Sequence, residues 1–198
     1  MSAYRTIVPD TDFEALRPAL LERLERIGSE VRAADIDLIF DGLMREVLEQ
    51  GFARVGAHEG TVWLLDDTGA NLAPALNTGP DAHRLTDFKQ PLNAGLISMV
   101  FSSEQSFLEN EVWKNSGQSK VLDTMLEKQT CAMIAVPFCF LHACRGVISC
   151  VQLKSAGSTE PDPSGFRSEH LVSIQRTADF LARLIELRVI RQIIGLNL

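Results

Sequence analysis

Hydrophobic residues recur at helical spacing near both ends of the chain and at strand spacing between them. Apolar positions three and four residues apart predict helices over about 11–28, 35–51, 96–101, 121–126 and 167–194. Pro18 is tolerated only in a first turn, so we expect the first helix to begin later than Thr11. Asp35 is the expected N-cap of the second helix.

Runs of β-branched and aromatic residues predict the strands. Residues 60–65 form such a run, the turn residues 66–69 follow, and residues 71–76 are expected to return as a hairpin. A short strand is expected at 106–108. The strongest pattern covers 131–141 and 146–153, with 142–145 as the connecting turn. Because these two strands are apolar on both faces, we expect a sheet that is covered on both sides.

The final predicted helix has two apolar stripes. One consists of Leu171, Ile174, Ala178, Leu181 and Ile185, and the second of Phe180, Leu184, Leu187 and Ile194. A helix that is apolar on two sides is either deeply buried or packs on a partner as well as on its own sheet. The pattern therefore favours a helix-mediated contact with another chain.

Composition and charge limit the kinds of molecule that this protein is expected to bind. The 198 residues are 45% hydrophobic and 23% charged, with a net charge of −7, which is typical of a globular domain and argues against nucleic acid or an anionic membrane as a partner. Arg183, Arg188 and Arg191 are expected to form a solvated helix side. The first residues lack the pattern of a signal peptide, and no apolar run is long enough to cross a bilayer. We expect a cytoplasmic protein with reduced thiols.

The order of these elements resembles the GAF domain family. Asp37-Leu38 through Gly51-Phe52-Ala53 is similar to that family's opening helix, and residues 60–69 to its first strand and turn. Residues 91–96 are similar to the segment before its pocket helix, and 135–138 with 146–148 to its central hairpin. The resemblance divides the chain into a lead-in and helix (1–34), a GAF domain with its C-terminal helix (35–190) and a tail (191–198).

The resemblance implies an α+β fold with a central antiparallel sheet of about six strands. Terminal helices would cover one face, and loops and short helices would enclose a small-molecule pocket on the other. It also implies a non-catalytic sensory module that dimerises through its N- and C-terminal helices and signals to a downstream protein. The ligand and any cofactor stay unknown, since the marks of the cyclic-nucleotide and bilin subfamilies are missing.

The middle segment holds the candidate ligand-binding residues. Four aromatic side chains are candidate apolar walls, and three polar ones are candidate orienting groups, as in most ligand cavities. They are Phe88, Phe101, Phe107 and Trp113, with Asn110, Glu111 and Lys114. The alternative is that these aromatic residues fill a core that holds no ligand, which would leave a dimerisation scaffold.

The cysteines and histidines suggest other chemistry. Cys131, Cys139, Cys144 and Cys150 lie in one apolar stretch without the spacing of a metal site. Buried cysteines usually act as small hydrophobes. The alternative is a thiol enzyme similar to free-methionine-sulfoxide reductases, which are also GAF proteins. Cys144, near the turn, is the expected exposed and redox-active thiol.

His83 is the candidate axial ligand if the sensor holds a haem, and Asp66-Asp67 fits a turn better than a metal site.

Overall fold

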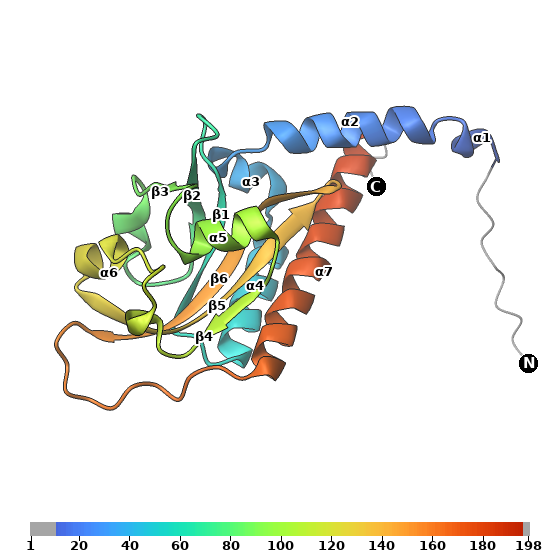
Figure 1. The fold of residues 1–198 in the computed structure, drawn as a ribbon. Helices are drawn as coiled ribbons and strands as arrows, with labels where there is room; N and C mark the ends of the chain where they lie inside the picture. Colours follow the sequence, from blue (N-terminus) through green and yellow to red (C-terminus); the bar gives the residue numbers. More distant parts are fainter. Residues whose placement is uncertain (1–10, 196–198) are drawn as a thin grey trace, which may run out of the picture.

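The structure is a computed structural model, and it describes residues 11–195. At its centre lies a six-stranded sheet in the order β3-β2-β1-β6-β5-β4, in which every paired strand is antiparallel (Figure 1). The strands are β1 (Glu59–Leu65), β2 (Asn71–Asn77), β3 (Gln90–Pro91), β4 (Phe107–Glu109), β5 (Lys128–Phe140) and β6 (Ala143–Ser155). The antiparallel sheet of about six strands that the family resemblance implied is confirmed.

Helices cover both faces of this sheet. On one side lie α4 (Gly42–Arg54) and the long α7 (Ser168–Ile193), and on the other α5 (Leu96–Ser103) and α6 (Val121–Leu126) (Figure 1). Two single-turn helices complete the second side, η2 (Ala82–Leu85) and η3 (Val112–Lys114). Near the N-terminus, α1 (Thr11–Glu14), α2 (Arg17–Glu30), η1 (Ala33–Asp35) and α3 (Ile36–Ile39) precede α4.

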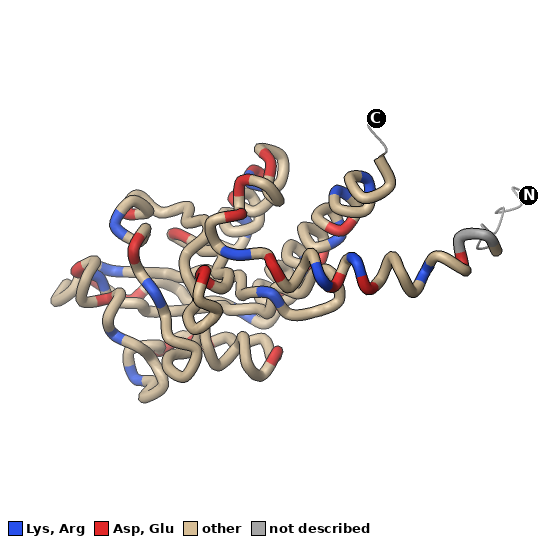
Figure 2. The backbone as a smooth tube through the Cα atoms, turned by 90° about the horizontal axis from the view of Figure 1, so that it is seen from above, with Lys and Arg blue, Asp and Glu red and all other residues tan. Residues whose placement is uncertain are grey.

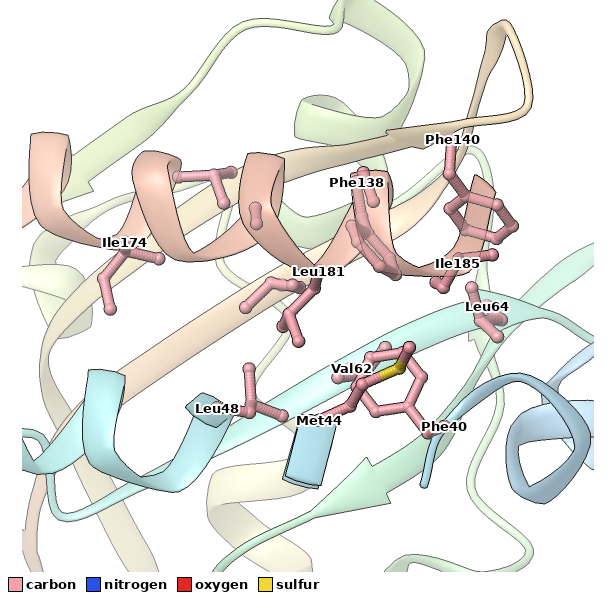
Figure 3. Close-up of a cluster of buried hydrophobic side chains, with 14 of the residues drawn as sticks. Phe40, Met44, Leu48, Val62, Leu64, Phe138, Phe140, Ile174, Leu181 and Ile185 are labelled. Atoms are coloured by element: carbon pink, nitrogen blue, oxygen red, sulfur yellow. The ribbon is translucent and has the colours of Figure 1, made fainter. Parts of the chain in front are cut away.

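The larger core lies between the sheet and the pair α4 and α7. Figure 3 shows Met44 and Leu48 of α4 facing Leu181 and Ile185 of α7, with strand residues closing the layer. In β1 the even-numbered residues Val62 and Leu64 enter this core, because alternate strand residues point to opposite faces. Of the two predicted apolar stripes of α7, the one that begins at Leu171 packs into this core.

Several elements differ from the sequence-based expectation. The helix expected over 35–51 is broken, because Phe40 is extended and Asp41 caps α4 by accepting a hydrogen bond from the Met44 amide at 2.9 Å. The connection between β5 and β6 is also shorter than expected, because Ala143 already pairs with Phe140 and only two residues form the turn. The strand β3 was not expected, since two residues carry no periodic signal.

The N-terminal part of α2 extends beyond the body of the domain (Figure 1), whereas Ile27 near its C-terminal end lies beside Ile185 and Arg188 of α7. Lys and Arg positions alternate with Asp and Glu positions along α2 (Figure 2), so this helix presents no patch of one sign. None of the helices among residues 11–195 is long and apolar enough to span a membrane. The predicted irregular lead-in at residues 1–10 lies outside the described residues.

Candidate ligand-binding site

A small cavity lies between the sheet and the cover formed by α5, α6 and the segment between them. Its floor consists of the odd-numbered residues of β1 and β6, which face away from the α7 core. The cavity volume is about 80 Å³. That space holds a few ordered waters or one small metabolite, whereas drug-sized ligands occupy roughly 300 Å³ or more.

Two hydroxyl groups point into the cavity from the centre of the sheet. Ser149 of β6 accepts a hydrogen bond from the Trp63 indole Nε1 at 2.9 Å, and Thr61 of β1 accepts one from the Asn77 amide at 2.7 Å. Both serine and threonine are buried, and each hydroxyl still has its own proton to donate. Trp63 is thereby fixed as a wall of the cavity, with its polar edge directed at Ser149.

On the opposite wall of the cavity, the side-chain amide of Gln118 has a carbonyl oxygen that accepts no hydrogen bond. Asp123 of α6 accepts hydrogen bonds from the Gln118 amide nitrogen at 3.0 Å and from the Thr130 hydroxyl at 2.6 Å. These bonds fix the Gln118 side chain, yet its carbonyl oxygen Oε1 is buried and has no hydrogen-bond partner. A buried acceptor without a partner costs free energy, about 1–3 kcal/mol, unless water or a ligand satisfies it.

A buried carboxylate stands at one end of the cavity. Burial raises the pKa of Glu59, and the Lys128 ammonium opposes that shift at a distance of 3.7 Å. Lys128 also pairs with Asp81 at 2.6 Å. Glu59, Lys128 and Leu153 line both the cavity and an open surface groove. The cavity and the groove therefore adjoin at the Glu59–Lys128 ion pair.

The four predicted aromatic wall residues do not line this cavity. Phe88, Phe101 and Phe107 pack in the smaller core beside it, where Phe88 meets Trp63 edge-on with ring centres 6.1 Å apart. Trp113 lies on η3 and lines an outer groove that shares Gln118 with the cavity. Their role in ligand binding stays a prediction.

The three predicted polar residues are engaged elsewhere. Asn110 binds the backbone of Phe166 through both ends of its carboxamide. Lys114 pairs with Glu111 at 2.5 Å, and both side chains are exposed to solvent. The structure thus places all three outside the cavity lining.

The candidate cysteine, aspartate and histidine residues outside the middle segment also lie away from the cavity. None of the four cysteines lines it, and the exposed thiol is Cys139, whereas Cys144, which was expected to be exposed, is half-buried. The turn at 66–69 uses the Asp66 carboxylate, which accepts from Thr68 at 2.7 Å. His83 lies on η2 and is not a lining residue.

Sequence reasoning missed the polar floor of the cavity. Glu59, Thr61 and Ser149 interrupt otherwise apolar strands at odd-numbered positions, and that alternation was a usable signal. A polar residue on a covered sheet face needs a partner. The apolar pattern of the second hairpin indicates that this face of the sheet is covered. The pattern does not indicate the cavity, because the cavity depends on where the cover segment lies.

Comparison with protein-family models gives no match, and comparison with the curated proteins gives none either. The solved structures give several. The GAF domain of an Acinetobacter phosphoenolpyruvate-protein phosphotransferase has a TM-score of 0.57 at 13% identity, covering 95% of this chain and 99% of that one. The second GAF domain of DevS from Mycobacterium smegmatis has a TM-score of 0.55 at 16% identity, covering 77% and 96%.

A third similar structure is an enzyme. The free methionine-R-sulfoxide reductase from Neisseria meningitidis, solved with its substrate, has a TM-score of 0.53 at 16% identity, covering 94% of this chain and 96% of that one. At such low identity a likeness establishes the fold and leaves the chemistry open. The chain has the fold of GAF domains.

Proposed function

We propose that this protein is a small-molecule-sensing regulatory module whose ligand binds in the cavity over β1, β5 and β6. The observation that carries the proposal is the Gln118 carbonyl oxygen, which is buried beside the cavity without a partner. A core that served packing alone would place apolar groups there, since leaving a polar group unsatisfied is costly.

The cavity favours a ligand that donates hydrogen bonds. Glu59 and the Gln118 oxygen are acceptors, and the Thr61 and Ser149 hydroxyls act as donors or acceptors. A molecule with an amine or amide group and a small apolar part fits this lining, which also contains Leu96 and Ile97. Access through the groove at Lys128 requires that its ion pair with Glu59 open.

Contacts from the cover segment reach α7, which gives the ligand a route to the helices. Gln175 of α7 donates to the Ser106 hydroxyl at 2.9 Å, and Asn110 holds Phe166 just before α7 begins. A ligand that moves the cover would shift these contacts. Such a shift becomes a signal when the ligand binds two arrangements of the helices unequally.

The terminal helices are the proposed output surface. Phe180 and Leu187 of α7 and Ile194, its C-cap residue, are 50–59% exposed and recur every seven residues. That spacing suits a helix–helix seam. Leu16 on α2 is also exposed, at 60%. The protein accordingly acts as a homodimer through α2 and α7, in the cytoplasm, and passes its signal to a downstream protein.

Two alternatives are weaker. A thiol-based sulfoxide reductase needs a cysteine at the substrate, and among residues 11–195 none lines the cavity. A pure dimerisation scaffold needs no ligand, but it gives no reason for the unpartnered Gln118 oxygen. The sensing function accounts for both the cavity and the exposed helices.

Native mass spectrometry of the purified full chain, followed by a thermal-shift screen of small amines and amides, tests the proposal. We expect one compound class to raise the melting temperature of the wild type by several degrees. Glu59→Gln should abolish that shift, and Thr124→Val, on the exposed side of α6, should preserve it. A shift of equal size in Glu59→Gln, or no bound mass and no shift at all, would contradict the proposal.

A further inference from the structure

Two of the four cysteines face each other across the β5–β6 hairpin. Cys139 of β5 is paired with Cys144 of β6, one step outward from the two-residue turn that Phe140 and Ala143 flank. Residues that lie opposite each other in an antiparallel pair have side chains on the same face of the sheet. The two thiols lie close enough to influence each other's ionisation.

The pairing position suits a covalent bond between the two sulfurs. The pair that flanks a two-residue turn exchanges ladder hydrogen bonds, so the next pair is of the non-hydrogen-bonded kind, with Cα atoms about 4.5 Å apart. Disulfides require a Cα separation of roughly 4.4–6.8 Å. The strand register shifts between Phe138 and Cys139, on the side of the pair away from the turn, while the pair itself keeps the regular position next to the turn. Closing the bond therefore requires mainly side-chain rotation.

The two thiols differ in access. Cys139 is exposed, whereas Cys144 is half-buried and donates to the Gly146 carbonyl at 3.3 Å. Burial raises the pKa of both thiols, to about 12 for Cys144, while contact with Cys144 acts to lower the pKa of Cys139. Cys139 is consequently the thiol that ionises first and meets a reagent from solvent.

We propose that Cys139 and Cys144 are a redox-active pair that low-molecular-weight disulfides oxidise to an intrachain, cross-strand disulfide. The Cys139 thiolate attacks one sulfur of the small disulfide, forms a mixed disulfide and releases one small thiolate, which takes up a proton. Cys144 then loses its proton and attacks the Cys139 sulfur, which releases the second small thiol. The protein loses two protons and two electrons in total, and the small disulfide takes them up to become two thiols.

The position of the pair connects this reaction to the terminal helices. In the turn, the backbone amide of Leu141 donates a hydrogen bond to the Glu186 carboxylate of α7 at 3.1 Å. Arg145 donates to the Glu25 carbonyl of α2 at 3.4 Å. A methyl group added at Gly28 would come within 2.9 Å of the Leu141 side chain, so α2 rests directly on the hairpin tip. A disulfide beside the turn stiffens the support of both helices.

The inference does not depend on the cavity, and peptide mass spectrometry tests it directly. Trypsin cleavage after Lys128 and Arg145 releases residues 129–145, which contain Cys131, Cys139 and Cys144. The reduced full chain is incubated with oxidised glutathione at pH 8, unfolded in urea with iodoacetamide so that buried thiols such as Cys131 also react, and digested. We expect this peptide to lack two hydrogen atoms and to carry one alkylated cysteine, at position 131.

Three variants assign the bond. Cys131→Ser should form it as fast as the wild type, Cys144→Ser should stop at a glutathione adduct on residue 139, and Cys139→Ser should form neither product. The proposal is overturned if the wild type stops at the glutathione adduct, stays fully alkylatable, or links Cys131 instead.

Discussion

Asn110 brackets the backbone of Phe166, donating to its carbonyl at 2.9 Å and accepting from its amide at 2.7 Å. The bond joins the end of β4 to the segment that leads into α7, across a gap of 56 residues in sequence. Phe166 is only 2% exposed and packs into the larger core. A residue that the sequence suggested for ligand binding thus joins two parts of the fold.

Asn110→Ala should lower the free energy of unfolding by about 1–2 kcal/mol, because the half-buried backbone carbonyl and amide of Phe166 both lose their hydrogen bonds. Urea unfolding of the full chain measures the loss. Asn93→Ala, at an exposed position, is the matched control and should change stability by less than about 0.5 kcal/mol. Equal losses in the two variants would remove the structural role of Asn110.

The hairpin turn is strained, which predicts opposite effects at its two residues. Leu141 and His142 both have positive φ, 50° and 66°, a region that costs ordinary residues about 1 kcal/mol or more. His142 is exposed, so His142→Gly should stabilise the protein by about 1 kcal/mol. Leu141 is fully buried, so Leu141→Gly should destabilise it by about 3 kcal/mol despite the same relief of strain. Thermal unfolding of the two variants distinguishes these effects by sign.

Stability should fall in acid partly because of Asp66. Hydrogen bonds from Thr68 and Asn71 hold the pKa of this buried carboxyl well below its usual range, with a further contribution from Lys89. A depressed pKa stabilises the fold above the pKa of the unfolded chain, about 3.9, and this stabilisation is lost as pH falls through the folded value. Asp66→Asn should therefore be less stable than the wild type at pH 7, with a gap that narrows below pH 4. A constant gap across that range would contradict this assignment.

Ionisation of Glu59 should affect the stability of the fold in the opposite direction. Its pKa is raised by burial, so ionisation costs stability as pH rises above the unfolded value of about 4.3. Glu59→Gln should leave stability at pH 7 unchanged or increase it by up to about 1 kcal/mol, as expected for a residue kept for binding. Calorimetry at pH 7 provides the measurement, and a clear loss would show that the ion pair with Lys128 is structural.

The exposed stripe of α7 predicts the oligomeric state. Phe180→Glu with Leu187→Glu should convert a dimer into a monomer, because charges at a packed seam are left without partners. Light scattering coupled to gel filtration gives the mass. Val121→Glu, on α6 at 60% exposure, is the control and should stay dimeric. A wild type that is monomeric at micromolar concentration would contradict the role given to α7.

The sequence alone determined the elements with strong periodicity. Strand β1, the hairpin β5–β6 and helix α7 have apolar patterns long enough to specify the type of element, which is why the hairpins and the long final helix were predictable. The complete antiparallel sheet was expected only from the resemblance to GAF domains. The break at Phe40–Asp41 was harder, since the apolar spacing continues through it and only the side-chain cap reveals the new start.

The tertiary structure alone decided which residues form the candidate site. The cavity combines β1, β5, β6, α5 and α6, and the polar side chains that define it lie up to about 90 residues apart, as Thr61 and Ser149 do. The same pairing of strands brings Cys139 opposite Cys144, where a one-residue shift of the turn would separate their faces. Periodicity specifies which face of an element is buried, whereas strand register and the position of the cover segment specify what that face meets.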